Sequence, residues 1–245
     1  MDMNGETVSQ WNAKRGAMLG VQVFAYALLI VIGAVWALAD TGAGIIAMMI
    51  ATVLLAVVLV LFHVYWPFRA TIIDRVIGLV AGALSLVFVT FPAAGKLFMV
   101  NDDSRAVLFD ANSAEIRWAA AVAGLLVVLT IVSFGRQMLR EERSHLIRAL
   151  SHCVTGGAAA ISLAGWLFFP YVVAGAITAP TILFAGVVAV MVLFALVLAY
   201  ASVWWLRELD ADPAQRAPWI GVALLPVMFF GLVSFAAALF LQIVG

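Results

Sequence analysis

Charged residues are scarce in this 245-residue chain: only 11% are Asp, Glu, Lys or Arg, and their charges cancel to a formal net charge of zero. A soluble globular domain is typically about a quarter charged, and a disordered chain combines high charge with low hydrophobicity. The low charge therefore excludes both classes. Because the chain has no net basic charge, it lacks the electrostatic footprint of a nucleic-acid-binding protein, and we expect no nucleic acid among its partners.

Cysteine is nearly absent as well, since Cys153 is the only one. One cysteine forms no disulfide within the chain, which excludes a disulfide scaffold. The sequence also lacks a phosphate-binding loop, a Gly-x-Ser-x-Gly segment and a His-Glu-x-x-His segment. These absences leave no signature of a hydrolase, a nucleotidase or a zinc protease, and no motif identifies a family.

Apolar residues are abundant: they make up 66% of the chain, and the mean hydropathy is +1.16. They gather in seven runs, and a helix needs about 20 apolar residues to cross the bilayer core. The runs are apolar on all sides and do not alternate with a period of two, which favours helices over a barrel. The sequence therefore predicts an all-α, polytopic transmembrane helix bundle. Its seven predicted spans are residues 16–39, 43–66, 76–100, 118–135, 149–175, 179–206 and 218–244.

The predicted bundle is a single transmembrane domain over residues 16–245, preceded by a short cytoplasmic segment, residues 1–15. The connections between the spans are too short to bury a core of their own. Any function driven by ATP or by a signalling domain would therefore require a separate partner protein.

Lys and Arg divide unequally between the two sides of the predicted bundle, with ten on the side of the N-terminus and three on the other. Cytoplasmic loops carry the excess of basic residues in membrane proteins. We therefore expect the N-terminus in the cytoplasm and the C-terminus outside. The ten are Lys14, Arg15, Arg69, Arg75, Arg136, Arg140, Arg143, Arg148, Arg207 and Arg216, and the three are Lys96, Arg105 and Arg117.

Two features leave alternatives open. The segment Ala37-Leu38-Ala39 resembles a signal-peptidase site, but the apolar run before it is longer than that of a usual signal peptide, which favours a retained first span. Pro170 lies inside the fifth predicted span, where it either kinks the helix or divides it into a helix and a shallow re-entrant piece.

Small residues four positions apart also recur in the predicted spans, as in Gly16 and Gly20, Gly78 and Gly82, and Gly156 and Ala160. This spacing lets helix backbones approach closely in a membrane. We interpret these pairs as ordinary helix-packing positions.

No charged residue falls at the centre of a predicted span, although a charge there would usually mark a function. Asp74 and Arg75 come closest, at the beginning of the third span. Asp74 is either an ion-pair or gating residue that faces the bundle, or half of an interface pair with Arg75 that reaches water. The position near the membrane edge favours the second interpretation.

His63 and His152 are further weak candidates, because both lie near the cytoplasmic ends of their spans. Paired axial histidines can hold a haem, but no supporting residue is apparent for either one, and we expect no cofactor and no metal. A lipid-modifying enzyme would require Asp74, His63, His152 and Cys153 to converge on one site.

The connection between the fourth and fifth spans carries Arg136, Arg140, Arg143 and Arg148. Such a basic loop attracts anionic lipid headgroups, and it can also dock a cytoplasmic partner. Contact with lipid is the simpler interpretation, since every multi-pass protein needs a positively charged inner loop.

Three functional hypotheses follow. The first is a permease-like subunit that moves a small solute or lipid together with partner proteins. The second is an accessory or scaffold subunit of a membrane complex that transports nothing, and the third is an intramembrane lipid-modifying enzyme. The richness in alanine and glycine favours a bacterial source, and hence the cytoplasmic membrane.

Tags at the two ends of the chain test the predicted topology. An epitope at the N-terminus is expected to be reached by antibody only after the membrane is opened, and alkaline phosphatase fused after Gly245 is expected to be active because it lies outside. Finding both ends in the same compartment would contradict an odd number of spans.

Overall fold

The computed structural model describes residues 3–39, 41–68, 71–91, 114–139, 146–207 and 216–244, and every regular element within them is a helix. Seven stretches of these helices are long and apolar enough to cross a membrane, which confirms the predicted helical multi-pass fold. The elements are α1 (Met3–Leu38), α2 (Thr41–Val64), α3 (Ile72–Thr90), α5 (Ala114–Met138), α6 (Leu146–Ser162), the 3₁₀ segment η2 (Leu163–Phe168), α7 (Phe169–Thr178), α8 (Thr181–Arg207) and α9 (Trp219–Val244).

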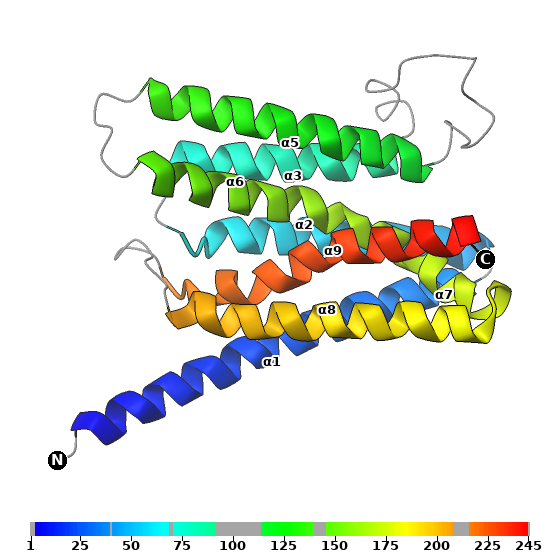
Figure 1. The fold of residues 1–245 in the computed structure, drawn as a ribbon, viewed down its shortest axis with the longest axis horizontal. Coiled ribbons are helices and arrows are strands. Elements are labelled where there is room, and N and C mark those ends of the chain that lie inside the picture. The colour runs from blue at the N-terminus through cyan, green and yellow to red at the C-terminus, as the bar shows by residue number, and fades with distance from the viewer. Residues whose placement is uncertain are drawn as a thin grey trace.

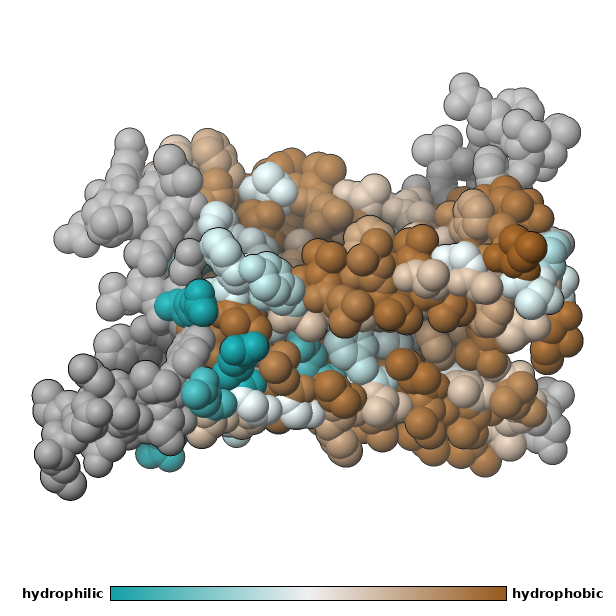
Figure 2. All heavy atoms as spheres, turned by 60° about the horizontal axis from the view of Figure 1, so that its bottom comes forward, coloured by the Kyte–Doolittle hydropathy of each residue, from teal (hydrophilic) through white to brown (hydrophobic). Residues whose placement is uncertain are grey.

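The helices run back and forth along one axis, and the two ends of the chain lie at opposite ends of the bundle (Figure 1). One end, here called the basic end, is where α1, α3, α6 and α9 begin and where α2, α5 and α8 end. Figure 2 shows hydrophilic residues near this end and a broad hydrophobic surface over the rest of the visible face. That surface matches the belt that lipid chains would cover.

The third span differs from its predicted range, 76–100, because α3 begins at Ile72 and ends at Thr90. It begins earlier because Thr71 and Asp74 form a capping box, in which each side chain bonds to the other residue's backbone N–H. It ends earlier because Phe91 is extended, and Pro92 follows in the sequence. The residue before a proline avoids the helical conformation.

The fourth span, predicted as residues 118–135, extends at both ends to Ala114–Met138. The prediction placed Glu115 and Arg117 outside this span and left open whether the span runs past Arg136, whose long side chain can reach the interface. The structure keeps all three within the helix, and Glu115 and Arg117 are buried. A helix accommodates such charges when other helices cover them.

The fifth span crosses the bundle without re-entering it, as α6, η2 and α7 in succession (Figure 1). The helix tightens to 3₁₀ geometry at Leu163–Phe168, where all six residues are buried. Pro170 follows in the first turn of α7, where no backbone N–H is required. Neither a re-entrant piece nor a simple kink at Pro170 describes this break, because the 3₁₀ segment lies before the proline.

The fifth and seventh spans form the centre of the bundle. About two thirds (67%) of the apolar stretch of each is buried, against 6% for α8. At their crossing, a side chain on Gly165 would overlap the carbonyl of Gly231, and one on Gly231 would overlap the carbonyl of Ser162. The two backbones therefore touch directly, which is how membrane helices gain packing energy without a hydrophobic driving force.

Two of the three predicted small-residue pairs also pack closely, in their case mainly against side chains. A Cβ on Gly82 would lie 2.6 Å from Leu59 Cδ1 and 2.9 Å from the Cβ of Ala160, and one on Gly156 would overlap Trp66. Gly16 and Gly20 have nothing within 4 Å among the described atoms, so the packing interpretation is not met there.

Gly231→Ala tests the backbone contact at the centre. The added methyl group would force α9 and the 3₁₀ segment apart, and we expect a loss of about 1–3 kcal/mol in the free energy of unfolding, measured by titration with a denaturing detergent. Gly186→Ala in α8 is the matched control. It meets nothing within 4 Å, so it should be neutral or slightly stabilising. Equal effects of the two variants would contradict the contact.

Candidate functional site at the basic end

Asp74 occupies a buried position at the start of α3, with 2% of its surface exposed. Its Oδ2 accepts hydrogen bonds from the backbone N–H of Thr71, at 3.0 Å, and from the Thr71 hydroxyl, at 2.7 Å. The hydroxyl oxygen in turn accepts from the backbone N–H of Asp74, at 3.4 Å. The same atoms thus begin the helix and hold the carboxylate in one orientation.

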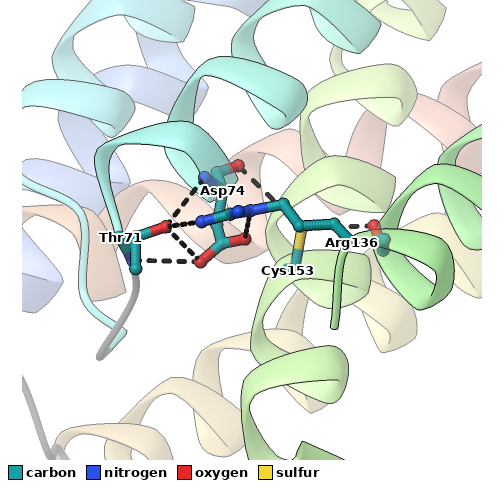
Figure 3. A network of polar contacts seen from close by, with 5 residues as sticks. Thr71, Asp74, Arg136 and Cys153 are labelled. Atoms are coloured by element: carbon teal, nitrogen blue, oxygen red, sulfur yellow. Dashed lines mark hydrogen bonds and ion pairs between the residues drawn. The ribbon is translucent and has the colours of Figure 1, made fainter. Parts of the chain in front are cut away.

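The partner charge comes from a different helix. Arg136, in the last turn of α5, donates from Nε to Asp74 Oδ1 at 3.0 Å and from Nη2 to the hydroxyl of Thr71 at 2.6 Å (Figure 3). The ion pair joins the start of α3 to the end of α5. Asp74 therefore faces the bundle, as in the ion-pair interpretation, and its observed partner is Arg136. Arg75, the neighbour considered from the sequence, is half-buried beside it.

Cys153 of α6 extends this network toward the third helix of the group. Its thiol lies 3.9 Å from the backbone carbonyl of Asp74, and the hydroxyl of Ser133 lies 3.2 Å from its sulfur. Both Cys153 and Ser133 are buried. Polar contacts among Asp74, Arg136, Ser133 and Cys153 therefore connect α3, α5 and α6 at the basic end (Figure 3).

The two candidate histidines lie in a row of aromatic rings beside this network. His63 contacts Trp66 with ring centroids 5.2 Å apart, Trp66 contacts Phe68 at 5.7 Å, and Phe68 stacks on His152 at 4.9 Å. Two rings thus separate the histidines along this row. The geometry does not present them as facing axial ligands.

The convergence that a lipid-modifying enzyme requires is not formed at His63. Its Nδ1 bonds to the carbonyl of Leu59 at 2.7 Å, whereas Cys153 bonds to Ser133 and to the backbone of Asp74. A nucleophile and its base need to lie within hydrogen-bond reach of each other. Within the described ranges, no group of three His, Cys, Asp or Glu residues is placed to hold a metal ion.

The predicted headgroup contacts fall partly outside the described residues. Arg140 and Arg143 lie in residues 140–145, between α5 and α6, and the side chain of Arg148 is also outside the description. Arg136 is described, and it pairs with Asp74, which leaves 21% of its side chain exposed.

The centre of the bundle carries polar contacts that the sequence did not single out. Trp118 Nε1 donates to the hydroxyl of Ser85 at 3.0 Å, and that hydroxyl donates to the carbonyl of Ile161 at 2.8 Å. Ile161 lies just before the 3₁₀ segment. The ring of Trp118 is a fully buried part of the core.

Two further side chains bond to backbone carbonyls of α9 at and beside its internal proline. Tyr26 Oη donates to the carbonyl of Pro226 at 3.0 Å, and Trp166 Nε1 donates to the carbonyl of Val227 at 2.8 Å. Only Pro226 could have been found from the sequence, since single serines and aromatic residues carry no distinctive signal in an apolar chain.

The end opposite the basic end has a buried polar contact of its own. Glu115 of α5 is 5% exposed and accepts from Gln242 Nε2 of α9 at 3.0 Å. Sequence reasoning missed it because Glu115 was placed in the loop before the fourth span and Gln242 at the end of the seventh. The contact joins the fourth and seventh helices.

Comparison of the chain with protein-family models, with curated proteins and with solved structures finds no match.

Asp74→Asn tests the buried ion pair. It leaves the charge of Arg136 without its partner in a mostly buried place, and we expect a loss of about 2–3 kcal/mol in the free energy of unfolding, less than for a fully buried pair because Arg136 keeps some contact with water. In a double-mutant cycle with Arg136→Gln, the two effects should not add. Arg207→Gln, at an exposed position, is the control. Additive losses would contradict the pairing.

Proposed function

We propose that this multi-pass membrane protein is a permease-like subunit that moves a small solute or lipid together with partner proteins in a bacterial cytoplasmic membrane. The observation that carries the proposal is the interruption of the fifth span by a 3₁₀ segment at the buried centre of the bundle. Interrupted helices near the middle of the membrane are the usual building blocks of transporter pathways.

The contact between the broken helix and α9 supports relative movement. Gly165 and Gly231 meet through backbone atoms, so neither of these two residues contributes a side chain that would interlock the helices. α9 also contains Pro226, which removes one backbone hydrogen bond from the helix. A shift between α and 3₁₀ geometry at Leu163–Phe168 would move α7 relative to α6 while the glycine contact slides.

Partners are part of the proposal because the printed sequence contains no phosphate-binding loop that would let it use ATP. Within the described spans, no Asp, Glu, His, Lys or Arg lies at a centre, where it would couple movement to protons. Membrane lipids contact the apolar belt, and the basic loop between α5 and α6 is the proposed contact for anionic headgroups or for a cytoplasmic subunit.

One observation favours the second hypothesis, an accessory subunit that transports nothing. Three polar groups near the 3₁₀ segment bond to one another: Trp118 donates to the hydroxyl of Ser85, and that hydroxyl donates to the carbonyl of Ile161. A centre that never opens to water would suit a scaffold. The two functions therefore differ in whether water reaches Ser85.

Thiol labelling decides between them. Cys153→Ser removes the only cysteine of the chain, and Ser85→Cys then places one thiol beside the 3₁₀ segment. In proteoliposomes with the partners present, a charged, membrane-impermeant thiol reagent is expected to modify this cysteine, because a pathway opens to water during transport.

Two single-cysteine controls show what fast labelling and no labelling by the reagent look like. Arg207→Cys at the basic end should react fast, and Val192→Cys on the lipid-facing surface of α8 should not react, because a charged reagent does not enter the hydrocarbon core. If Ser85→Cys stays unmodified from both sides while Arg207→Cys reacts, the permease proposal is wrong and the accessory role is supported.

A further inference from the structure

A small cluster of buried apolar residues, separate from the main core, lies where α1, α8 and α9 meet. Its buried members are Met18, Leu206, Val222 and Ala223. Partly buried residues of the same three helices pack against it, namely Leu19, Val21, Val203, Trp205 and Trp219. Because α8 ends and α9 begins beside this cluster, the three helices converge at the basic end. We call this place the α1–α8–α9 corner.

Four basic residues stand next to the cluster, and all four are exposed. In α1, Lys14 and Arg15 lie one turn before the residues that join the cluster, on the same faces of the helix. In α8, Arg207 lies one turn beyond Val203, which packs against the cluster. Arg216 comes three residues before the start of α9. None of the four forms an ion pair with another described residue, so their positive charge faces outward from the corner.

A stripe of exposed side chains on α8 leads to one of these cations. The stripe consists of Leu193, Val197, Tyr200 and Trp204, which are 53–68% exposed. Their spacing of four, three and four residues places them on one face of the helix, and Arg207 follows three residues later on that face. The rings of Tyr200 and Trp204 contact each other, with centroids 6.5 Å apart. Since Tyr and Trp gather at the level of the headgroups, the stripe runs from the hydrocarbon core to that level and ends at a cation.

An anionic phospholipid matches both parts of this surface. Its acyl chain is complementary to the stripe, and its phosphate is complementary to the cations, which long side chains present at the interface. Figure 2, in which the side of the bundle that carries α1 and α8 comes forward, shows hydrophilic residues at the basic end directly beside the hydrophobic surface. A free phosphate or an acidic protein segment would meet the cations but would leave the stripe unused.

We propose that the α1–α8–α9 corner binds an anionic phospholipid. The phosphate contacts cations from both sides of the corner, Lys14 and Arg15 on one side and Arg207 and Arg216 on the other, and one acyl chain lies along the stripe on α8. The site is distinct from the basic loop between α5 and α6, and it does not rest on the transport proposal.

Quenching of tryptophan fluorescence by brominated lipids tests this site in bilayers that contain the full-length protein. Bromine quenches at short range, so the quenching that disappears in Trp204→Phe belongs to that ring among the eight tryptophans. Brominating each lipid in turn gives the ratio of the binding constants of phosphatidylglycerol and phosphatidylcholine at Trp204. A cation near the membrane surface strengthens binding of an anionic headgroup about fivefold, so a headgroup held from both sides should be preferred about twentyfold.

Two double variants remove the two sides of the site separately. Lys14→Gln with Arg15→Gln, and Arg207→Gln with Arg216→Gln, should each lower the ratio at least about fivefold, because each leaves the headgroup held from one side only. All four positions are exposed, so the fold should not depend on them. Arg207→Lys with Arg216→Lys keeps the charge and should keep the preference.

The matched control removes the same charge from the same end of the molecule. Arg140→Gln with Arg143→Gln, in the loop between α5 and α6, should leave the ratio at Trp204 within about twofold, because these positions lie outside the corner. Equal losses in the loop variant and the corner variants would show only the general attraction of a positive surface, and the proposal would be wrong.

Other outcomes would also overturn the site. A ratio near one in the unmodified protein would leave the cations available to an acidic segment of a partner protein, and an effect in only one of the two corner variants would show that no headgroup bridges the helices. Millimolar inorganic phosphate should not reduce the preference, because the acyl chain keeps the lipid in place. Loss of the preference in phosphate would assign the cations to the free anion.

Discussion

The structure depends most on the direct contact between two backbones at the middle of the bundle. Where the 3₁₀ segment crosses α9, Gly165 and Gly231 allow carbonyls and α-carbons to touch. Lipid chains are as apolar as leucine side chains, so membrane helices gain little from burying leucine against leucine and much from close packing. This contact makes the fifth and seventh spans the centre around which the other helices are arranged.

Close approach of backbones has a requirement of its own, because polar backbone groups released at a break must find partners away from water. In this bundle, single side chains from other helices bond to backbone carbonyls close to the two irregular positions: Ser85 to the carbonyl of Ile161, Tyr26 to that of Pro226 and Trp166 to that of Val227. Each of these bonds also joins two helices. The irregular backbone and the polar core are therefore one feature, and movement of the break would have to exchange these bonds.

The sequence predicted the class of fold and the number of spans because twenty apolar residues in a row leave few alternatives in water or in lipid. The boundaries were harder. Thr71 and Asp74 form a cap that apolar counting ignores, and the buried Glu115 and Arg117 look like the end of a span when read alone. Asp74 was recognised as a position of interest, but its partner Arg136 stands 62 residues away, and nothing in an isolated sequence connects the two.

The glycines also show that spacing in the sequence does not tell which positions contact a neighbouring helix. Spacing alone marked Gly16 and Gly20 as strongly as Gly78 and Gly82, although only the second pair meets neighbouring helices among the described atoms. What decides such a position is the partner surface, which depends on the arrangement of all the helices.

The length of the first helix affects how a neighbouring molecule can approach the N-terminal side of the bundle. α1 comprises 36 residues, Met3–Leu38, and an α-helix rises about 1.5 Å per residue, so it is roughly 54 Å long against a hydrocarbon core of about 30 Å. It therefore extends past the bundle at the basic end (Figure 1). Its first turns act as a stiff spacer that carries the beginning of the chain beyond the ends of the other described helices, and a neighbouring molecule that approaches from this side meets the projecting rod first.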